Sequence, residues 1–431
     1  MLGNVADPAQ RRIIAGRRLR RRFRGGTSLP SPPRPCPFPA EPSCARAPPP
    51  HSFTPRAAAQ TPPPSSDARR TSCPPPALVV DLDQLEGNIT RLATHAKAAG
   101  IALRPHAKTH KCAAIARLQV AAGALGVCVA TLREAEAMAE GGVGGILITS
   151  EMVGSVKIRR LLELARRQPD TMSVVDDPGH AAELSAAARA AGLILNVLID
   201  VDPGSRRTGV AAGEGAAQLA RKIAGLPGLR LRGIHCYSGS SAHVTGFEQR
   251  RAHSERAMSP AIATFRELRR EGLPMEILSG GSTGTYNIDP AFGAMTELQA
   301  GSYVFMDVDY RRIGGARGPV YDDFPPSLAV IATVISRPGR NRATVDAGLK
   351  AFATDRKFGP EPKDLPGATF SWGGDEHGIL DLTQASREPR LGERLEFIVP
   401  HCDPTVNLHD HIHALRGDRV EAVWPVARGY G

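Results

Sequence analysis

Lys108 lies in a strongly basic octapeptide, Arg104–Lys111, between an apolar run at Ile101–Leu103 and a helical pattern from Ala113 to Ala121. Neighbouring cations disfavour the charged form of a lysine, so the amine of Lys108 can be held partly neutral in this setting. A neutral lysine amine can form a Schiff base with an aldehyde. The octapeptide by itself also fits an ordinary basic turn between a strand and a helix, so the other motifs of the chain must decide.

A second segment, from Gly280 to Thr285, has the composition of a phosphate-binding loop. Its glycines allow several backbone N–H groups to converge, and the hydroxyls of Ser282, Thr283 and Thr285 add further donors. The segment lacks the Gly-Lys-Ser/Thr ending of a Walker loop. Clusters of this composition also occur in ordinary turns, so the segment predicts a phosphate site only together with other motifs.

A third motif, His401-Cys402-Asp403, places an imidazole and a carboxylate two residues apart. In an extended chain, His401 and Asp403 project to the same face and could bind one cation, while Cys402 points away. Further along, His409, His411 and His413 alternate at the strand period. They could form a second metal-binding face or be ordinary strand residues.

Short apolar runs that alternate with amphipathic stretches must position these motifs. The strands that we expect are 77–82, 101–104, 126–130, 146–150, 172–175, 195–201, 231–236, 275–278 and 297–305. This alternation predicts a parallel sheet that is buried on both faces. About eight repeats favour a closed (β/α)₈ barrel over residues 76–325, with its chemistry on the loops that follow the strands. A lysine suited to an imine, a phosphate-binding segment and Arg207 on such loops point to pyridoxal phosphate.

The pattern changes after residue 325. The segments 327–334, 342–347, 395–399 and 420–426 read as strands separated by Gly- and Pro-rich loops, without a long helix between them. We therefore expect a mostly antiparallel β domain over residues 326–431, which carries the metal motif. The first strand, within residues 76–84, precedes the first barrel helix and could join this domain.

Residues 1–75 form a Pro- and Arg-rich leader with 13 arginines, no lysine and three acidic residues. Such a segment cannot bury enough apolar surface to order itself, so we expect it to be disordered. Its composition fits an organelle transit peptide, which would place the protein in a plastid or mitochondrion, or a dispensable leader of a cytoplasmic protein. Nearly all of the net charge of +11 lies in this leader, so the charge does not support nucleic-acid binding by the folded part. No apolar run is long enough to span a membrane, and the seven cysteines show no disulfide spacing.

The chain resembles the D-threonine aldolase and eukaryotic-type D-serine dehydratase family, which has an alanine-racemase-like barrel. The segments that carry the resemblance are Arg-Pro-His-Ala-Lys-Thr-His-Lys, Gly-Ser-Thr-Gly-Thr-Tyr and Gly-Ser-Tyr-Val-Phe-Met-Asp, and the match runs in order through residues 76–431. The resemblance implies that Lys108 binds pyridoxal 5'-phosphate as an imine, with Arg207 in contact with the cofactor ring and Tyr237 beside it. It implies a phosphate site made of Gly281, Ser282, Thr283, Gly284 and Thr285, completed by Gly301 and Ser302. From the residues alone, Arg207 could instead pair with Asp200 or Asp202, and Tyr237 could be a packing residue.

The resemblance also implies a divalent metal beside the cofactor, bound by His401 and Asp403. Dehydratase members look like His-x-Cys at this site, whereas aldolase members look like His-x-Asp, as here. We expect Mn²⁺, Mg²⁺ or Zn²⁺, and a carboxylate in place of a thiolate favours the first two. His243 matches a histidine near the substrate in aldolase members and is the candidate catalytic base, although it could be a surface-loop residue.

The implied activity is that of a pyridoxal-phosphate- and metal-dependent lyase. It would cleave D-threonine and related D-β-hydroxy-α-amino acids to glycine and an aldehyde. The alternatives are a D-serine dehydratase, a 3-hydroxy-D-aspartate aldolase or dehydratase, and a non-catalytic pyridoxal-phosphate homeostasis protein. The expected partner is a small D-amino acid, and by analogy with the family we expect a homodimer.

Overall fold

Eight parallel strands form the first sheet of the computed structural model, which describes residues 68–430. In sequence order the strands are β2 (Ala102–Leu103), β3 (Cys128–Val129), β4 (Leu147–Ile148), β5 (Met172–Val175), β6 (Leu195–Asp200), β7 (Leu229–Cys236), β8 (Ile277–Gly280) and β9 (Glu297–Leu298). They pair in the order β2-β9-β8-β7-β6-β5-β4-β3, and a parallel bridge between His106 and Cys128 joins the two ends. The strands thus close into a ring, and the predicted (β/α)₈ barrel is confirmed.

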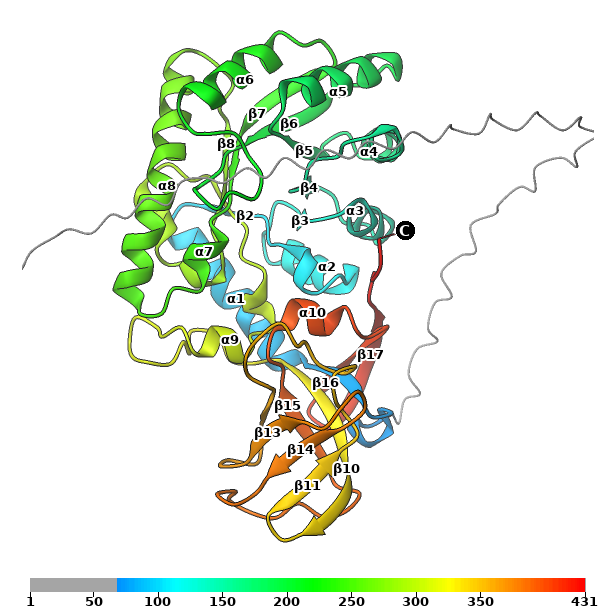
Figure 1. The fold of residues 1–431 in the computed structure, drawn as a ribbon. Helices are drawn as coiled ribbons and strands as arrows, with labels where there is room; N and C mark the ends of the chain where they lie inside the picture. The colour runs from blue at the N-terminus through cyan, green and yellow to red at the C-terminus, as the bar shows by residue number, and fades with distance from the viewer. Residues whose placement is uncertain (1–67, 431) are drawn as a thin grey trace, which may run out of the picture. The chain divides into compact units, whose positions relative to one another are not determined.

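Helices surround these strands (Figure 1). They are α1 (Leu82–Ala98), α2 (Ala113–Ala121), α3 (Leu132–Glu140), α4 (Ser155–Arg167), α5 (Pro178–Ala190), α6 (Glu214–Ala224) and α8 (Phe247–Arg270). In α4, for example, Ile158, Leu161, Leu162 and Ala165 recur at helical spacing and are buried, while the lysine and arginines lie on the other face. Such stripes hold each helix against the apolar strands.

The second sheet has nine strands. They are β1 (Ala77–Asp81), β10 (Leu328–Gly339), β11 (Arg342–Val345), β12 (Glu361–Pro362), β13 (Thr369–Trp372), β14 (Gly378–Asp381), β15 (Arg394–Ile398), β16 (His411–Arg416) and β17 (Arg419–Pro425). The order is β13-β14-β11-β10-β1-β16-β17, and β15 pairs with β10 and β12. Every pairing in this sheet is antiparallel except that of β1 with β16, which agrees with the mostly antiparallel sheet that we expected.

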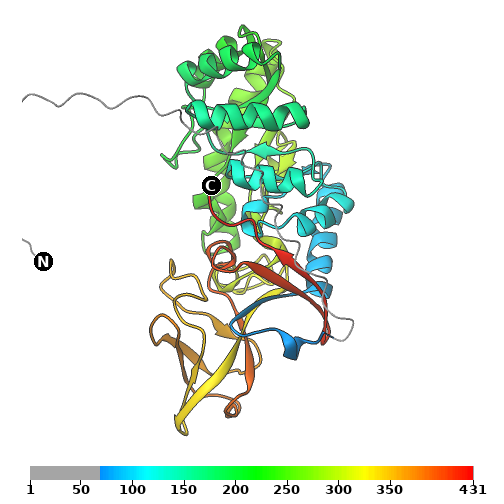
Figure 2. The ribbon, with the colours of Figure 1, turned by 90° about the vertical axis from the view of Figure 1, so that its right-hand side faces the viewer.

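Strand β1 is a central strand of this second sheet, although it precedes the whole barrel in the chain. It pairs antiparallel with β10 and parallel with β16, and Figure 2 shows it in blue among the yellow and red strands. Leu78 and Val80 pack into the main core, while Ala77 and Val79 belong to a smaller cluster on the other face. The chain therefore begins the second sheet, builds the barrel and returns. The exact domain boundaries that we assigned stay a prediction.

Short helical elements carry most of the motifs. They are α7 (Gly239–Ala242), α9 (Val308–Arg311), α10 (Cys402–Val406), and the 3-10 helices η1 (Arg70–Ser72), η2 (Ala107–Thr109), η3 (Thr283–Thr285), η4 (Asp289–Phe292) and η5 (Ser302–Val304). The extended conformation that we expected at the metal motif is wrong, because His401 is the N-cap of α10 and Asp403 lies in its first turn. An acidic residue followed by Pro404 is typical of a helix start.

Two further sequence expectations concern the whole chain. No helix among residues 68–430 is long and apolar enough to cross a membrane. The cysteines in this part, Cys73, Cys112, Cys128, Cys236 and Cys402, are buried and form no disulfide. The predicted leader falls almost entirely on residues 1–67, which lie outside the described part.

Candidate active site

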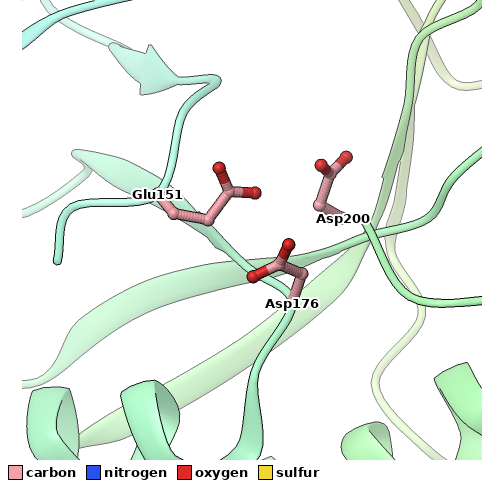
Figure 3. Close-up of side chains that lie close together, drawn as sticks. All are labelled: Glu151, Asp176 and Asp200. Carbon is pink, nitrogen blue, oxygen red and sulfur yellow. The ribbon is translucent and has the colours of Figure 1, made fainter. Parts of the chain in front are cut away.

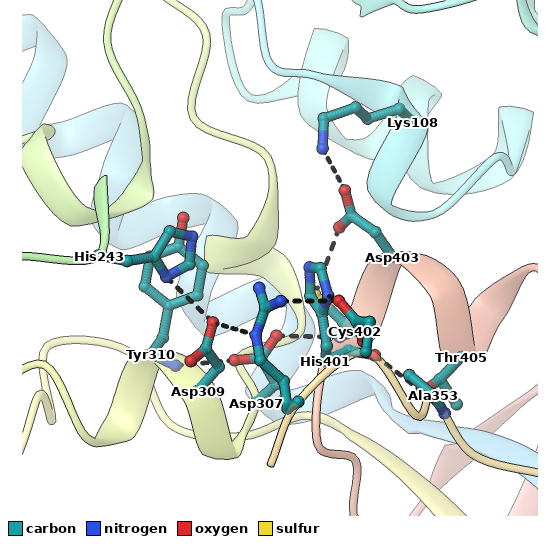
Figure 4. A network of polar contacts seen from close by, with 12 residues as sticks. Lys108, His243, Asp307, Asp309, Tyr310, Ala353, His401, Cys402, Asp403 and Thr405 are labelled. Carbon is teal, nitrogen blue, oxygen red and sulfur yellow. Dashed lines mark hydrogen bonds and ion pairs between the residues drawn. The ribbon is translucent and has the colours of Figure 1, made fainter. Parts of the chain in front are cut away.

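Lys108 lies in η2, directly after the first barrel strand, as the sequence predicts. Its Nζ forms an ion pair with the carboxylate of Asp403 from α10 of the second sheet's domain (Figure 4). Burial opposes the charged amine, but the negative charge of Asp403 outweighs burial, so the pKa of Lys108 is raised above its ordinary value. Our expectation of a partly neutral lysine is therefore wrong for this state, because we considered only the neighbouring cations and not the acid brought in from residue 403.

Two adjoining cavities meet at Lys108. The first is lined by Ser282, Thr283, Gly301, Ser302, His243, His401 and Asp403, among others. The second is lined by Arg207, Glu151 and His235, among others. His106, Lys108, Tyr237 and Gln299 line both cavities. The structure thus gathers most of the predicted site residues, from both sheets, around one lysine.

The predicted phosphate segment divides into lining and supporting residues. Ser282 and Thr283 line the first cavity with Gly301 and Ser302, whereas Gly281, Gly284 and Thr285 do not. The hydroxyl of Thr285 donates to Asp289 Oδ2 at 2.6 Å, so its proton is not available to a phosphate. A Cβ on Gly284 would lie 2.0 Å from the backbone oxygen of Ala242, so glycine is required for η3 to pack against α7.

Arg207 and Tyr237 lie against each other on the loops after β6 and β7. The guanidinium carbon of Arg207 is 5.4 Å from the centroid of the Tyr237 ring. Asp200 is bound to His235 and Thr208, and Asp202 accepts backbone N–H groups of its own turn. Neither acid forms an ion pair with Arg207 in the described structure, so the alternative pairing that we considered is not observed there.

Several buried polar atoms around Lys108 have no hydrogen-bond partner within the described residues. Among them are Nε2 of His235, which is 1% exposed, and Oε1 of Gln299, which is 2% exposed. Both residues line the second cavity. Because an unpaired buried polar group costs about 1–3 kcal/mol, such atoms point to a polar ligand. The cavity therefore fits a polar cofactor that reaches Lys108.

The metal motif also faces the first cavity. The carboxylate of Asp403 is ionised: burial opposes the charge, but Lys108 and His401 outweigh it and the pKa of Asp403 is lowered. Nδ1 of His401 lies 2.7 Å from Oδ2 of Asp355, which leaves Nε2 as its available ligand atom. Imidazole and carboxylate are ligands that a hard divalent cation accepts, and solvent or substrate would supply the remaining ligands. Cys402 between them is buried, as expected.

His243 follows α7 and lies in the same cavity. Its Nδ1 is 3.0 Å from Oδ2 of Asp309, and its ring lies 4.7 Å from the ring of Tyr310 (Figure 4). Burial raises the pKa of Asp309, but His243 and Arg356 outweigh burial and lower it to about 2. The contact lacks hydrogen-bond alignment, but the carboxylate charge beside Nδ1 favours a proton there, which leaves Nε2 of His243 free to take a proton.

An acidic cluster at the carboxyl ends of β4, β5 and β6 was not predicted. Glu151, Asp176 and Asp200 are the one group of three or more metal-ligating side chains between residues 68 and 430 whose ligand atoms all lie within 4.8 Å (Figure 3). Burial and the charges of Asp200 and Asp176 raise the pKa of Glu151 to about 7. Asp176 and Asp200 follow an apolar run directly, and Glu151 follows one after Thr149 and Ser150, which is the sequence signal that could have found them. The three histidines at 409, 411 and 413 form no such group there.

Comparisons with known proteins agree with this architecture. The family described as alanine racemase, N-terminal domain, matches residues 80–309, and the putative serine dehydratase domain matches residues 327–415. A 3-hydroxy-D-aspartate aldolase from Paracoccus denitrificans is 38% identical over 360 residues, covering 83% of this chain and 92% of that protein. A D-threonine aldolase from an Arthrobacter species is also 38% identical over 360 residues, covering 82% of this chain and 93% of the other.

Solved structures show the same relationship. A D-threonine aldolase from Filomicrobium marinum is 40% identical, with a TM-score of 0.80 over 84% of this chain and 97% of that one. A cysteine mutant of a D-threo-3-hydroxyaspartate dehydratase in the metal-free form is 32% identical, with a TM-score of 0.75 over 83% and 99%. The chain therefore belongs to the family of D-threonine aldolases, 3-hydroxy-D-aspartate aldolases and related dehydratases.

Proposed function

We propose that this protein is a pyridoxal-phosphate- and divalent-metal-dependent aldehyde-lyase that cleaves D-threonine and related D-β-hydroxy-α-amino acids to glycine and an aldehyde. The observation that carries the proposal is the convergence of Lys108, His243 and the His401/Asp403 pair on one cavity. Aldolases among the relatives support the reaction class.

The barrel residues would hold the cofactor. Lys108 would bind it covalently, the hydroxyls of Ser282, Thr283 and Ser302 would hold its phosphate, and Tyr237 with Arg207 would lie against its ring. When bound, pyridoxal phosphate supplies an electron sink for the pair of electrons released as the Cα–Cβ bond breaks. The unpaired buried atoms of His235 and Gln299 would offer polar contacts to the bound cofactor.

His243 would remove the proton from the β-hydroxyl of the substrate. Its Nε2 faces away from the Asp309 carboxylate, which holds the ring and stabilises the imidazolium that forms. His401 and Asp403 would hold the divalent cation, whose role as a Lewis acid is to lower the pKa of that hydroxyl. The metal-free form named for one relative supports a metal in this family.

Dehydration is the second candidate, because a D-threo-3-hydroxyaspartate dehydratase from Delftia is 33% identical over 377 residues. Asp403 favours the aldolase over the dehydratase, whose members look like His-x-Cys. We expect Asp403→Cys to shift products from aldehyde toward oxoacid. An unchanged product ratio with metal still bound would refute the role given to this residue.

The experiment that tests the proposed function uses the purified full chain with D-threonine, D-serine and D-3-hydroxyaspartate, with and without a chelator. We expect glycine and acetaldehyde from D-threonine, lost on chelation and restored by Mn²⁺. Borohydride reduction followed by peptide mapping should place the cofactor on Lys108, and Lys108→Ala should abolish both adduct and turnover. An adduct without metal-stimulated aldehyde release would favour the homeostasis protein instead. We also propose a homodimer, to be checked by light scattering.

A further inference from the structure

Five side chains form a continuous chain of polar contacts between the two histidines of the site (Figure 4). Asp309 Oδ2 lies 3.0 Å from His243 Nδ1 and accepts from Arg356 Nε at 2.8 Å. Asp355 Oδ2 accepts from Arg356 Nη1 at 2.7 Å and lies 2.7 Å from His401 Nδ1. We call Asp309, Arg356 and Asp355 the carboxylate–arginine bridge.

The bridge joins segments from distant parts of the chain. His243 is the C-cap of α7 and Asp309 lies in α9, while Asp355 and Arg356 come from the loop between β11 and β12. The side chains are only 16% to 39% exposed, so water does not fully screen their attraction. The planar guanidinium uses two different nitrogens for the two acids, which fixes the separation of the carboxylates.

Both carboxylates face the same ring nitrogen of their histidine. His401 Nδ1 is hydrogen-bonded to Asp355, and an ionised carboxylate can only accept, so this nitrogen carries the proton. His243 Nδ1 lies 3.0 Å from Asp309 Oδ2 without hydrogen-bond alignment, and the negative charge at that distance still favours a proton on Nδ1 over a lone pair. Nε2 of each ring then keeps its lone pair, which is the form needed to bind a cation or to accept a proton. Both histidines line the first cavity, so the two free nitrogens belong to one site.

We propose that Asp355 and Asp309 are positioning residues that hold His401 and His243 in the Nδ1–H tautomer, and that Arg356 fixes the two histidines relative to each other. The inference rests on the proposed function, because it gives His401 a cation and His243 a proton. It divides the bridge into two roles that can be separated: Asp355 serves metal binding, and Asp309 serves proton removal.

The test compares Asp355→Ala with Asp309→Ala in the cofactor-loaded full chain. Mn²⁺ affinity is measured from the electron paramagnetic resonance signal of the free ion, and kcat and KM are measured with D-threonine. Asp355→Ala should weaken Mn²⁺ binding about 10- to 100-fold, and excess Mn²⁺ should restore its kcat. Asp309→Ala should keep its Mn²⁺ affinity within about twofold while kcat falls, with KM little changed and no rescue by Mn²⁺.

Four further variants sharpen the comparison. Asp355→Asn and Asp309→Asn should recover part of each loss, since an amide oxygen still accepts from Nδ1–H. Arg356→Lys keeps the charge but not the planar fork, and we expect it to impair both readouts. Asp375→Ala removes an exposed carboxylate that pairs only weakly with Lys350, 3.7 Å away, and should change neither.

Wild-type Mn²⁺ affinity in Asp355→Ala, or equal loss of affinity in both alanine variants, would overturn the inference. A failure of the proposed function can be distinguished from a failure of this inference. A wild-type protein whose Mn²⁺ affinity is unchanged by His401→Ala, or that releases no glycine, refutes that function alone. Nitrogen-15 spectra of histidine-labelled protein then still test the bridge, since an Nε2–H tautomer at His243 or His401 would contradict it.

Discussion

At the scale of single residues, the pairing of Lys108 with Asp403 decides how the amine behaves. The two groups come from different sheets and neutralise each other's charge. The barrel alone presents a partly buried lysine, and the acid from α10 is the main charge that raises its pKa. Asp403 therefore controls both the reactivity of the amine and the proposed metal site.

We expect Asp403→Asn to lower the pKa of Lys108, because burial would then act without the main opposing charge. A lower pKa means more neutral amine at a given pH, so the imine with added pyridoxal phosphate should form at lower pH than in the wild type. Absorbance titrations of cofactor-free protein measure this midpoint. A midpoint that is unchanged or higher would show that Asp403 does not set the charge of Lys108.

His110 gives a second prediction at this scale. Burial lowers its pKa to about 4, from an ordinary value of about 6.5. Between about pH 6.5 and pH 4, His110 is protonated in the unfolded chain but neutral in the folded one. The free energy of unfolding therefore falls as the pH drops from about 6.5 to about 4. At 1.36 kcal/mol per pKa unit the loss is roughly 3 kcal/mol.

His110→Asn removes this titration while keeping an acceptor for the backbone N–H of Cys112. Urea unfolding at pH 7 and at pH 4 should show a smaller acid-induced loss in the variant than in the wild type. All other titrating groups are shared, so their contribution cancels in the comparison. Equal losses in the two proteins would mean that His110 is protonated when folded.

Sequence reasoning found the cofactor motifs because each follows an apolar strand of a parallel barrel, and such loops converge at one end. That rule explains why Lys108, Arg207, Tyr237 and Ser282 meet. It could not find Asp309, Asp355 or Arg356, since their contacts depend on how irregular loops of two sheets meet. It also misjudged the charge of Lys108 for the same reason.

At the scale of elements, the contact between η3 and α7 links the phosphate segment to His243. Gly284→Ala would place a methyl group 2.0 Å from the backbone oxygen of Ala242, so one element must shift. We expect a loss of about 1–3 kcal/mol of stability, together with weaker binding of pyridoxal phosphate. Chemical denaturation and cofactor titration measure the two effects.

Gly87→Ala is the matched control. Gly87 lies inside α1, is exposed, and a Cβ there meets nothing within 4 Å. Because glycine is a poor helix former, this variant should be about 0.5–1 kcal/mol more stable and should bind the cofactor normally. Destabilisation in both variants would argue against a specific contact at Gly284.

Hydrophobic periodicity predicted the long elements well and the short ones poorly. Strands such as β6 and helices such as α4 bury enough apolar residues to be recognised. Helix α10 spans only Cys402–Val406. The alternating His401 and Asp403 suggested an extended segment, although Asp403 and Pro404 mark the start of a helix. Strands β12, β13 and β14 lie in a loop-rich stretch and were missed.

At the scale of the whole molecule, the second sheet is built from both ends of the described chain. Val80 in β1 is fully buried and pairs with Leu328 and Ala414. Val80→Ala should cost about 2 kcal/mol through the cavity that it leaves. Hydrogen exchange should quicken in β10 and β16 and stay unchanged in β5 to β7.

Val153→Ala, at a residue that is 54% exposed, should change the stability by less than about 0.5 kcal/mol. If Val80→Ala speeds exchange in the barrel strands as much as in the second sheet, the two sheets unfold as one unit. The local hydrophobic pattern predicted that β1 is a strand but did not determine which of the two sheets it joins. Its partners lie hundreds of residues away, beyond the range of any periodicity.

The position of β1 has a consequence for biosynthesis. The ribosome releases this strand early, but its neighbour β16 emerges roughly 330 residues later, which takes on the order of 20–60 s at typical elongation rates. Its other neighbour, β10, emerges roughly 250 residues after β1, and until then the nascent segment must stay unpaired and shielded from aggregation. Asp403 lies 295 residues after Lys108, so Lys108 meets its counter-ion only once that whole stretch has been synthesised.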